Sequence, residues 1–216
     1  EGIEGKALVE KPSGTSTLTL NNTNAYTGMT SIKAGALLLN GTIADSRVWI
    51  DSAAAFTNTA SGRLTGSASL IINGKANLRG NSDFTGGTSI AVTQTYDPAL
   101  VPVLVNDLRA LGSGDVSVLK GTVAFQTAGG SFGRYSTLTL GESGSVLLFV
   151  NNDIAVTWLG DVVVPNTLVE LRPRSSSSSL TFGEPGCSTE VRATSAGGIF
   201  VRESGQLHWY SRLRLG

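Results

Sequence analysis

The chain contains very little cysteine, histidine or charge. Its 216 residues include one cysteine, Cys187, and one histidine, His208, and only 15% of them are charged, against about 25% in an average globular protein. One cysteine cannot form a disulfide within the chain, so the fold depends on packing and is not that of a small disulfide-rich domain. A single histidine and a single cysteine also argue against a zinc-type metal site.

Long apolar segments and an excess of one charge sign are missing too. The longest apolar run, residues 146–150, is far shorter than the ~20 residues that a membrane span needs. The 16 Lys and Arg residues balance the 16 Asp and Glu residues, and no long basic run occurs. Binding to nucleic acid and direct insertion into a membrane are therefore disfavoured.

Glycine and short apolar alternations are abundant instead. Glycine accounts for 27 of the 216 residues, well above the usual share of about 7%, and serine, threonine and asparagine fill most other polar positions. Runs such as Thr17–Leu20 and Thr137–Leu140 alternate with a period of two and are bounded by turn residues. Many short strands joined by tight turns indicate an all-β solenoid, sandwich or barrel.

A sequence repeat, with one copy starting at Leu20 and the other at Leu78, decides between these architectures. Each copy reads leucine, five residues, an aromatic, then Thr-Gly-x-Thr-Ser-Ile, and the repeat-defining residues are Leu20, Tyr26, Gly28, Ile32, Leu78, Phe84, Gly86 and Ile90. We expect the glycine to form a corner, the isoleucine to point inward, and the aromatic to stack on its counterpart in the next coil. The interval between the copies would hold two or three coils of about 20 to 30 residues each, so the repeat predicts a β-solenoid.

Two segments, residues 14–43 and 76–140, resemble the passenger-associated repeat of bacterial autotransporters. Gly14-Thr-Ser-Thr-Leu-Thr-Leu20, Tyr26-Thr-Gly-Met-Thr-Ser-Ile32 and the following Ala-Gly-Ala-Leu are similar to that repeat, and Ala110-Leu-Gly-Ser-Gly114 is similar to its next portion. The resemblance implies a right-handed parallel β-helix displayed outside the cell. Residues 91–107 depart from the pattern as an insertion, and no membrane-barrel domain precedes Gly216. Phage fibres and capsid decoration proteins also use β-helices, so a virion component is the alternative.

Composition divides the chain into three parts. Residues 1–13 are predicted to cap the stack or contact a partner, residues 14–174 to form the solenoid, and residues 180–216 to form a C-terminal β segment that caps or docks. The serine run 175–179 is read as a solvated turn between the last two parts. Residues 97–112 are expected to project as a loop, with a short helical insertion near 98–111 that ends at Gly112.

Few residues indicate catalysis. His208 could act as a base for Cys187, which lies roughly one coil earlier in the chain, but a buried free cysteine is the commoner arrangement. Gly112-Ser-Gly-Asp115 is similar to a calcium-binding turn, but that motif normally repeats in tandem. The acidic residues are scattered rather than clustered as polysaccharide cleavage would need. We therefore predict no enzyme activity, no catalytic or cofactor-binding residue and no metal.

Aromatic and arginine residues near the C-terminus are the predicted partner contacts, because such residues anchor most protein interfaces. This group consists of His208, Trp209, Tyr210, Arg212 and Arg214, with Arg202 as a further candidate for capping. Trp49 and Trp158 lie in apolar runs, which favour a role in the core or in a side stack.

Three functional hypotheses follow. The first is a non-enzymatic, surface-displayed structural or adhesin-like module, located at the cell surface or outside the cell. The second is a phage virion protein, in a tail fibre or on a capsid. The third is a glycan-active enzyme. The predicted partners are proteins of a surface or virion assembly, a surface glycan, and further copies of the chain.

Overall fold

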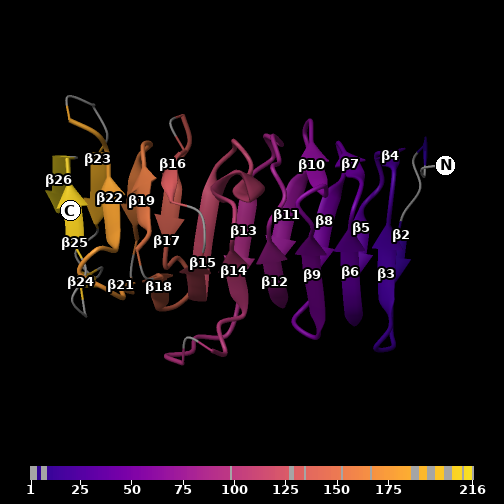
Figure 1. The fold of residues 1–216 in the computed structure, drawn as a ribbon, viewed down its shortest axis with the longest axis horizontal. Helices are drawn as coiled ribbons and strands as arrows, with labels where there is room; N and C mark the ends of the chain where they lie inside the picture. Colours follow the sequence, from indigo (N-terminus) through magenta and orange to yellow (C-terminus); the bar gives the residue numbers. More distant parts are fainter. Residues whose placement is uncertain are drawn as a thin grey trace.

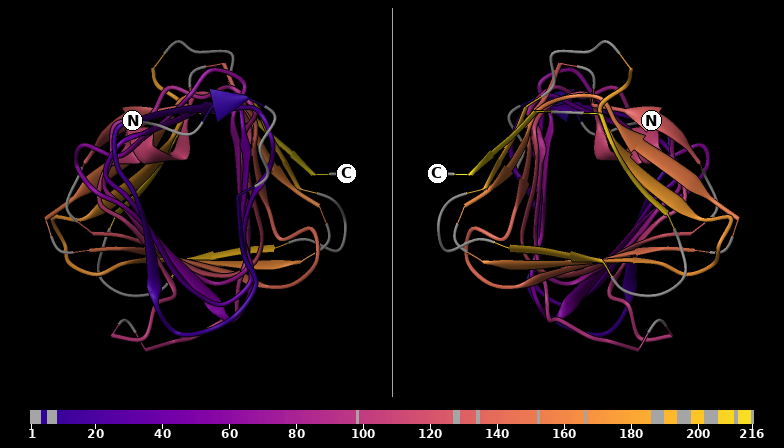
Figure 2. Two further views of the ribbon diagram at one scale, coloured as in Figure 1. Left: turned by 90° about the vertical axis from the view of Figure 1, so that its right-hand side faces the viewer. Right: turned by 90° about the vertical axis from the view of Figure 1, so that its left-hand side faces the viewer.

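The chain coils into a stack of parallel strands with its two ends at opposite ends of the stack (Figure 1). The computed structural model describes residues 4–5, 9–97, 99–126, 129–133, 135–151, 153–165, 167–185, 190–193, 198–201, 206–210 and 212–215. Seen end-on, the coils enclose one interior and present three sides, which we call faces 1, 2 and 3 (Figure 2). The predicted all-β solenoid is confirmed.

Face 1 is an unbroken parallel ladder through the whole described stack. Its strands are β2 (Val9–Lys11), β5 (Thr30–Ile32), β8 (Arg47–Ile50), β11 (Ser69–Ile72), β13 (Thr88–Ala91), the first half of β15 (Val116–Phe125), β17 (Leu138–Leu140), β20 (Val162–Val164), β23 (Glu190–Ala193) and β26 (Arg212–Leu215).

Face 2 follows face 1 in most coils and is also continuous. Its strands are β3 (Thr17–Leu20), β6 (Gly35–Leu39), β9 (Ala54–Asn58), β12 (Lys75–Leu78), β14 (Val103–Val105), the second half of β15, β18 (Val146–Val150), β21 (Leu168–Pro173) and β24 (Gly198–Val201). β15 serves both faces because it bends at Gly121, whose φ is +98°.

Face 3 is interrupted in the middle of the stack. Its first group is β1 (Glu4–Gly5), β4 (Thr23–Tyr26), β7 (Thr42–Ala44) and β10 (Arg63–Thr65), and its second is β16 (Gly130–Phe132), β19 (Ala155–Trp158), β22 (Ser179–Phe182) and β25 (Gln206–Trp209). Between them lies a 3₁₀ helix, η1 (Leu108–Leu111). β1 and β2 pair with β4 and β5, so the described part of residues 1–13 is itself a coil of the stack.

The interior explains the sequence repeat. The isoleucines of face 1 lie in one inward row, where Ile32 pairs with Ile50, Ile50 with Ile72, and Ile72 with Ile90. All four are at most 1% exposed. The interval from Ile50 to Ile72 is longer than the intervals on either side of it, so the repeat spans three coils of unequal length.

The predicted stacking of the repeated aromatics is wrong. Tyr26 and Phe84 are fully buried. Tyr26 lies four residues before Thr30, and Phe84 lies four residues before Thr88; these two threonines belong to a second inward row of face 1. Because they lie three coils apart, roughly 14 Å, they cannot contact each other. Aromatic contact occurs later, where Phe132 meets Trp158 edge to face with ring centroids 4.7 Å apart. Trp158 is 1% exposed, as predicted for a core residue.

The projecting loop is shorter than the predicted 97–112. Residues 103–105 form β14 within face 2. η1 begins after Asp107, whose Oδ1 accepts from the Arg109 amide at 3.0 Å, and it ends at Gly112. Leu108 and Leu111 are buried, so this helical turn belongs to the core and fills the gap in face 3.

Gly112 is required at the end of this turn. Its φ is +78°, and a Cβ there would lie 2.8 Å from the Phe84 ring. The helical turn and the repeated aromatic are therefore packed directly on each other. The prediction of a projecting loop was wrong for residues 103–112, whose apolar side chains are needed inside the stack, while Leu100 before them is 69% exposed.

The serine run forms a corner. Ser178 is fully buried, and its hydroxyl donates to the Asn151 carbonyl at 2.7 Å. Parallel pairing continues beyond it on all three faces, from β19 to β22, β20 to β23 and β21 to β24. A separate C-terminal unit stays a prediction.

Candidate functional site

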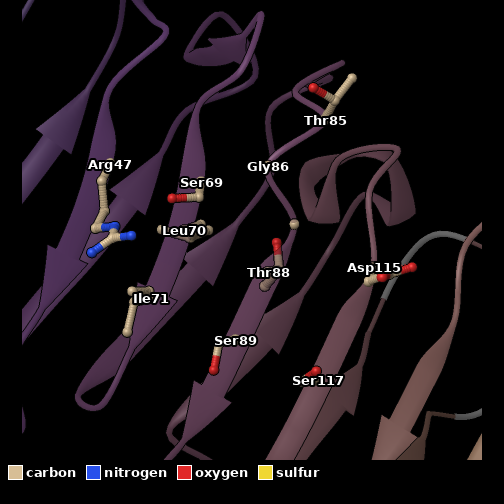
Figure 3. A pocket seen from close by; sticks show the side chains of 11 residues that line it. Arg47, Ser69, Leu70, Ile71, Thr85, Gly86, Thr88, Ser89, Asp115 and Ser117 are labelled. Carbon is tan, nitrogen blue, oxygen red and sulfur yellow. The ribbon is translucent and has the colours of Figure 1, made fainter. Parts of the chain in front are cut away.

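A hollow of about 310 Å³ lies on the outer side of face 1 (Figure 3). It extends from β8 to β15, and we call it the face-1 hollow. Its lining residues are Arg47, Ser69, Leu70, Ile71, Thr85, Gly86, Gly87, Thr88, Ser89, Asp115 and Ser117.

Small outward side chains create this hollow. Strand alternation places Ile71, Ser89 and Ser117 in one outward row across three coils. Gly87, directly before β13, has no side chain, and its φ is +82°. A Cβ at Gly87 would lie 2.7 Å from the carbonyl oxygen of Asp115, so the close approach of two coils requires glycine there.

Opposite charges stand at the two ends of the hollow. Arg47 is exposed on β8, beside Ser69 and Leu70 (Figure 3), and within the described part of the chain it forms no ion pair. Asp115 lies three coils away, about 14 Å along the stack. Its Oδ1 accepts a hydrogen bond from the Thr137 amide at 2.7 Å.

Trp49 lies beside the hollow. It is not in the core, which was one of the two places predicted for it. It pairs in register with Ile71, and 36% of its surface is exposed. Val48 and Ile50 occupy the inward positions of β8 and are fully buried. The sequence signal for an outward tryptophan was its place between these two apolar residues. Successive side chains of a strand point to opposite sides, so a residue between two inward residues points outward.

The predicted C-terminal contact group is only partly described. His208 is partly buried, its Nε2 lies 3.0 Å from Gln206 Oε1, and its ring stacks on Tyr210 at 6.4 Å between centroids. Tyr210 is 49% exposed. Trp209 pairs in register with Phe182 on face 3, and its side chain is outside the described residues. A role of this group in partner binding stays a prediction.

The structure describes the other predicted residues only in part or not at all. Arg212 and Arg214 pair in register with Glu190 and Arg192 in face 1, and their side chains are outside the described residues. Cys187 and Arg202 also lie outside the described residues. The hypothesis of a Cys187 nucleophile with His208 as base therefore stays a prediction.

The repeat-defining residues serve the stack. Leu20, Tyr26, Ile32, Leu78, Phe84 and Ile90 are all at most 5% exposed. Gly28 and Gly86 form corners, since the Gly28 carbonyl accepts from the Ser46 hydroxyl at 2.5 Å and the Gly86 amide donates to the Ala68 carbonyl at 2.9 Å.

Several acidic side chains join one coil to the next at corners. Asp45 Oδ1 accepts from the Ser67 amide at 2.7 Å and from its hydroxyl at 3.0 Å, and the Ser67 amide is the main cause that lowers the pKa of Asp45. Asp153 accepts from the Ser177 hydroxyl in a similar way. Asp45 and Asp153 have positive φ values of 57° and 62°. No cluster of three or more metal-ligating side chains occurs among the described residues.

The outer side of face 2 is covered in its middle part. The segment between β13 and β14 packs over an apolar cluster made of Val101, Leu104, Ala124, Leu147 and Phe149. Thr122 anchors this segment, because its hydroxyl accepts from the Thr95 amide at 2.8 Å and donates to the Thr95 carbonyl at 2.9 Å.

An arginine closes the covered side. The Arg172 guanidinium lies 5.1 Å from the Tyr96 ring centroid and 5.7 Å from that of Phe149. Its Nε donates to Glu170 Oε1 at 2.7 Å. Face 2 is therefore filled by side chains at this segment, and the face-1 hollow is the stronger candidate site.

Comparison with protein-family models, curated proteins and solved structures finds no match to the chain. Within the described residues, no helix is both long and apolar enough to cross a membrane.

Proposed function

We propose that the chain is a non-enzymatic structural or adhesin-like module displayed on a surface. The observation that carries the proposal is the unbroken parallel ladder of face 1, from β2 to β26. A continuous ladder makes a stiff rod whose long sides are available for binding. The resemblance of residues 14–43 and 76–140 to the autotransporter passenger repeat supports display outside the cell.

The use of the acidic residues favours a non-catalytic role. Asp45, Asp115 and Asp153 each accept hydrogen bonds from the next coil, which leaves them occupied with stacking. Hydrolysis of a glycosidic bond typically uses two carboxyl groups that face each other at a fixed separation. To test this, the chain is incubated with a panel of acidic and neutral polysaccharides. We expect no new reducing ends and no loss of viscosity, and either change would contradict the proposal.

A virion protein is the second candidate. The same stiff rod would suit a fibre or a capsid decoration, and the resemblance extends to phage-like surface proteins. Immunogold electron microscopy of the source material, with antibodies against residues 14–174, separates the two. Label on the cell envelope supports the first candidate, label on virus particles supports the second, and label confined to the cell interior contradicts both.

A further inference from the structure

We infer that the face-1 hollow binds a short oligosaccharide that carries a carboxylate, with that carboxylate held at Arg47. The inference rests on the proposed function, because it assumes that the glycan is held and not cut. The outward apolar cluster on face 2 is already filled by the segment between β13 and β14.

The charge of the ligand follows from Arg47. Its guanidinium is exposed and has no ion-pair partner within the described part of the chain. Asp45, two positions earlier, accepts hydrogen bonds from Ser67 instead. Arginine presents a planar set of N–H donors that fits a carboxylate with two parallel hydrogen bonds. The end of the hollow at β8 therefore favours a carboxylate.

The polar character of the ligand follows from the floor of the hollow. Ser69, Ser89 and Ser117 lie on successive coils, and no described residue forms a hydrogen bond with their hydroxyls. Each hydroxyl can both donate and accept, as can the hydroxyls of a sugar. At the far end, Asp115 Oδ1 accepts from the Thr137 amide, and the second oxygen of the same carboxylate can accept from a ligand hydroxyl, which would be a charge-assisted bond.

Apolar surface and length complete the match. Trp49 beside the hollow offers a flat ring for the C–H face of a sugar, and Ile71 in the hollow adds apolar surface. The ~14 Å between the coils of Arg47 and Asp115 suits an oligosaccharide better than a single sugar. A peptide strand is a poorer fit, because the strands that line the hollow are paired on both sides and leave no edge for strand addition.

The test uses the whole chain and short oligogalacturonates, with the fully methyl-esterified oligomers as a neutral match. Binding is measured by calorimetry and by amide chemical shifts. We expect the acidic oligomer to bind with shifts at Ser69, Ser89 and Ser117, and Arg47→Ala to weaken that binding by about tenfold or more. Methyl-esterified oligomers should bind weakly and be insensitive to Arg47→Ala.

Two further variants keep the test independent of folding. Arg63→Ala is the matched control, because Arg63 is an exposed arginine on face 3, and it should leave binding unchanged. Ser89→Phe fills the hollow from an outward position and should abolish binding while circular dichroism and the melting temperature stay those of the parent.

Three results would overturn the inference: no binding of the acidic oligomer, shifts away from the hollow, or equal losses with Arg47→Ala and Arg63→Ala. In each case an intact, inactive rod would leave the proposed function standing. Release of reducing ends by a chain that still binds through Arg47 would instead contradict the proposed function alone.

Discussion

Faces 1 and 2 are built from the same alternating strands, yet their outer sides differ. Outside face 1, Ile71, Ser89 and Ser117 leave an open hollow. Outside face 2, Ala124, Leu147 and Phe149 form a second apolar cluster under the segment between β13 and β14. An outward position in a solenoid is therefore not necessarily an exposed one, because an insertion can cover it.

The largest difference should appear between two outward aromatics. Phe149 on face 2 is 2% exposed, and Trp49 on face 1 is 36% exposed. Phe149→Ala should lower the free energy of unfolding by about 3–5 kcal/mol, because it leaves a cavity under the covering segment. Trp49→Ala, at a side chain that keeps 36% of its surface exposed, should lower it by less, about 1–2 kcal/mol. Chemical denaturation measures both, and equal losses would contradict the comparison.

A smaller loss is expected for the charge pair on the covered side. The side chains of Arg172 and Glu170 are 16% and 6% exposed, so Glu170→Ala leaves a mostly buried guanidinium without this carboxylate. We expect a loss of about 3 kcal/mol in the same denaturation experiment. The exposed pair Lys33–Glu10 is the control, and Lys33→Ala should have no measurable effect. A negligible effect of Glu170→Ala would mean that the pair does not stabilise the cover.

A local effect is expected for the anchor of the covering segment. Thr122→Val keeps the shape of the side chain but removes both hydrogen bonds to Thr95. The expected loss is about 1–2 kcal/mol, with faster amide hydrogen exchange in residues 93–97 and 99–101. Thr139→Val, on the outer side of face 1, should alter neither quantity. Unchanged exchange in the segment would show that apolar contacts alone hold it.

The smallest effect concerns Asp45 at the corner before β8. Hydrogen bonds from Ser67 lower the pKa of Asp45 in the folded state, so its contribution is present above the unfolded pKa of about 3.9 and is lost as the pH falls through the folded value. Asp45→Asn should lower the melting temperature at neutral pH, and the gap to the parent should narrow below about pH 4. A gap that is constant with pH would contradict this account.

The sequence predicted the solenoid because patterns over a few neighbouring residues indicate which side chains point into the core. Thr-Ser-Ile, which begins at Thr30 and again at Thr88, marks the inward row of face 1, and Gly28 and Gly86 mark its corners. The register within three coils was not predictable, since the coils between the two copies differ in length and in corner residues. Ser46 and Ala68 occupy corner positions of those coils, and both are buried.

The candidate site was not found from the sequence. Arg47, Ser89 and Asp115 are far apart in the chain and no single motif joins them, and each alone is typical of a solvated strand or corner. They share one hollow only because stacking places their coils next to each other. Trp49 was within reach, since the alternation of Val48 and Ile50 determines its outward direction.

By itself, the sequence determined that this chain forms stacked strands around an aliphatic interior, because glycine corners and alternating apolar residues act over a few neighbouring positions. The tertiary structure alone decided which outward residues meet, that Leu108 and Leu111 belong to the core, and that one outer side is covered while another stays open. Those outcomes depend on which coil lies next to which, and that register arises from corner lengths and packing across the whole stack.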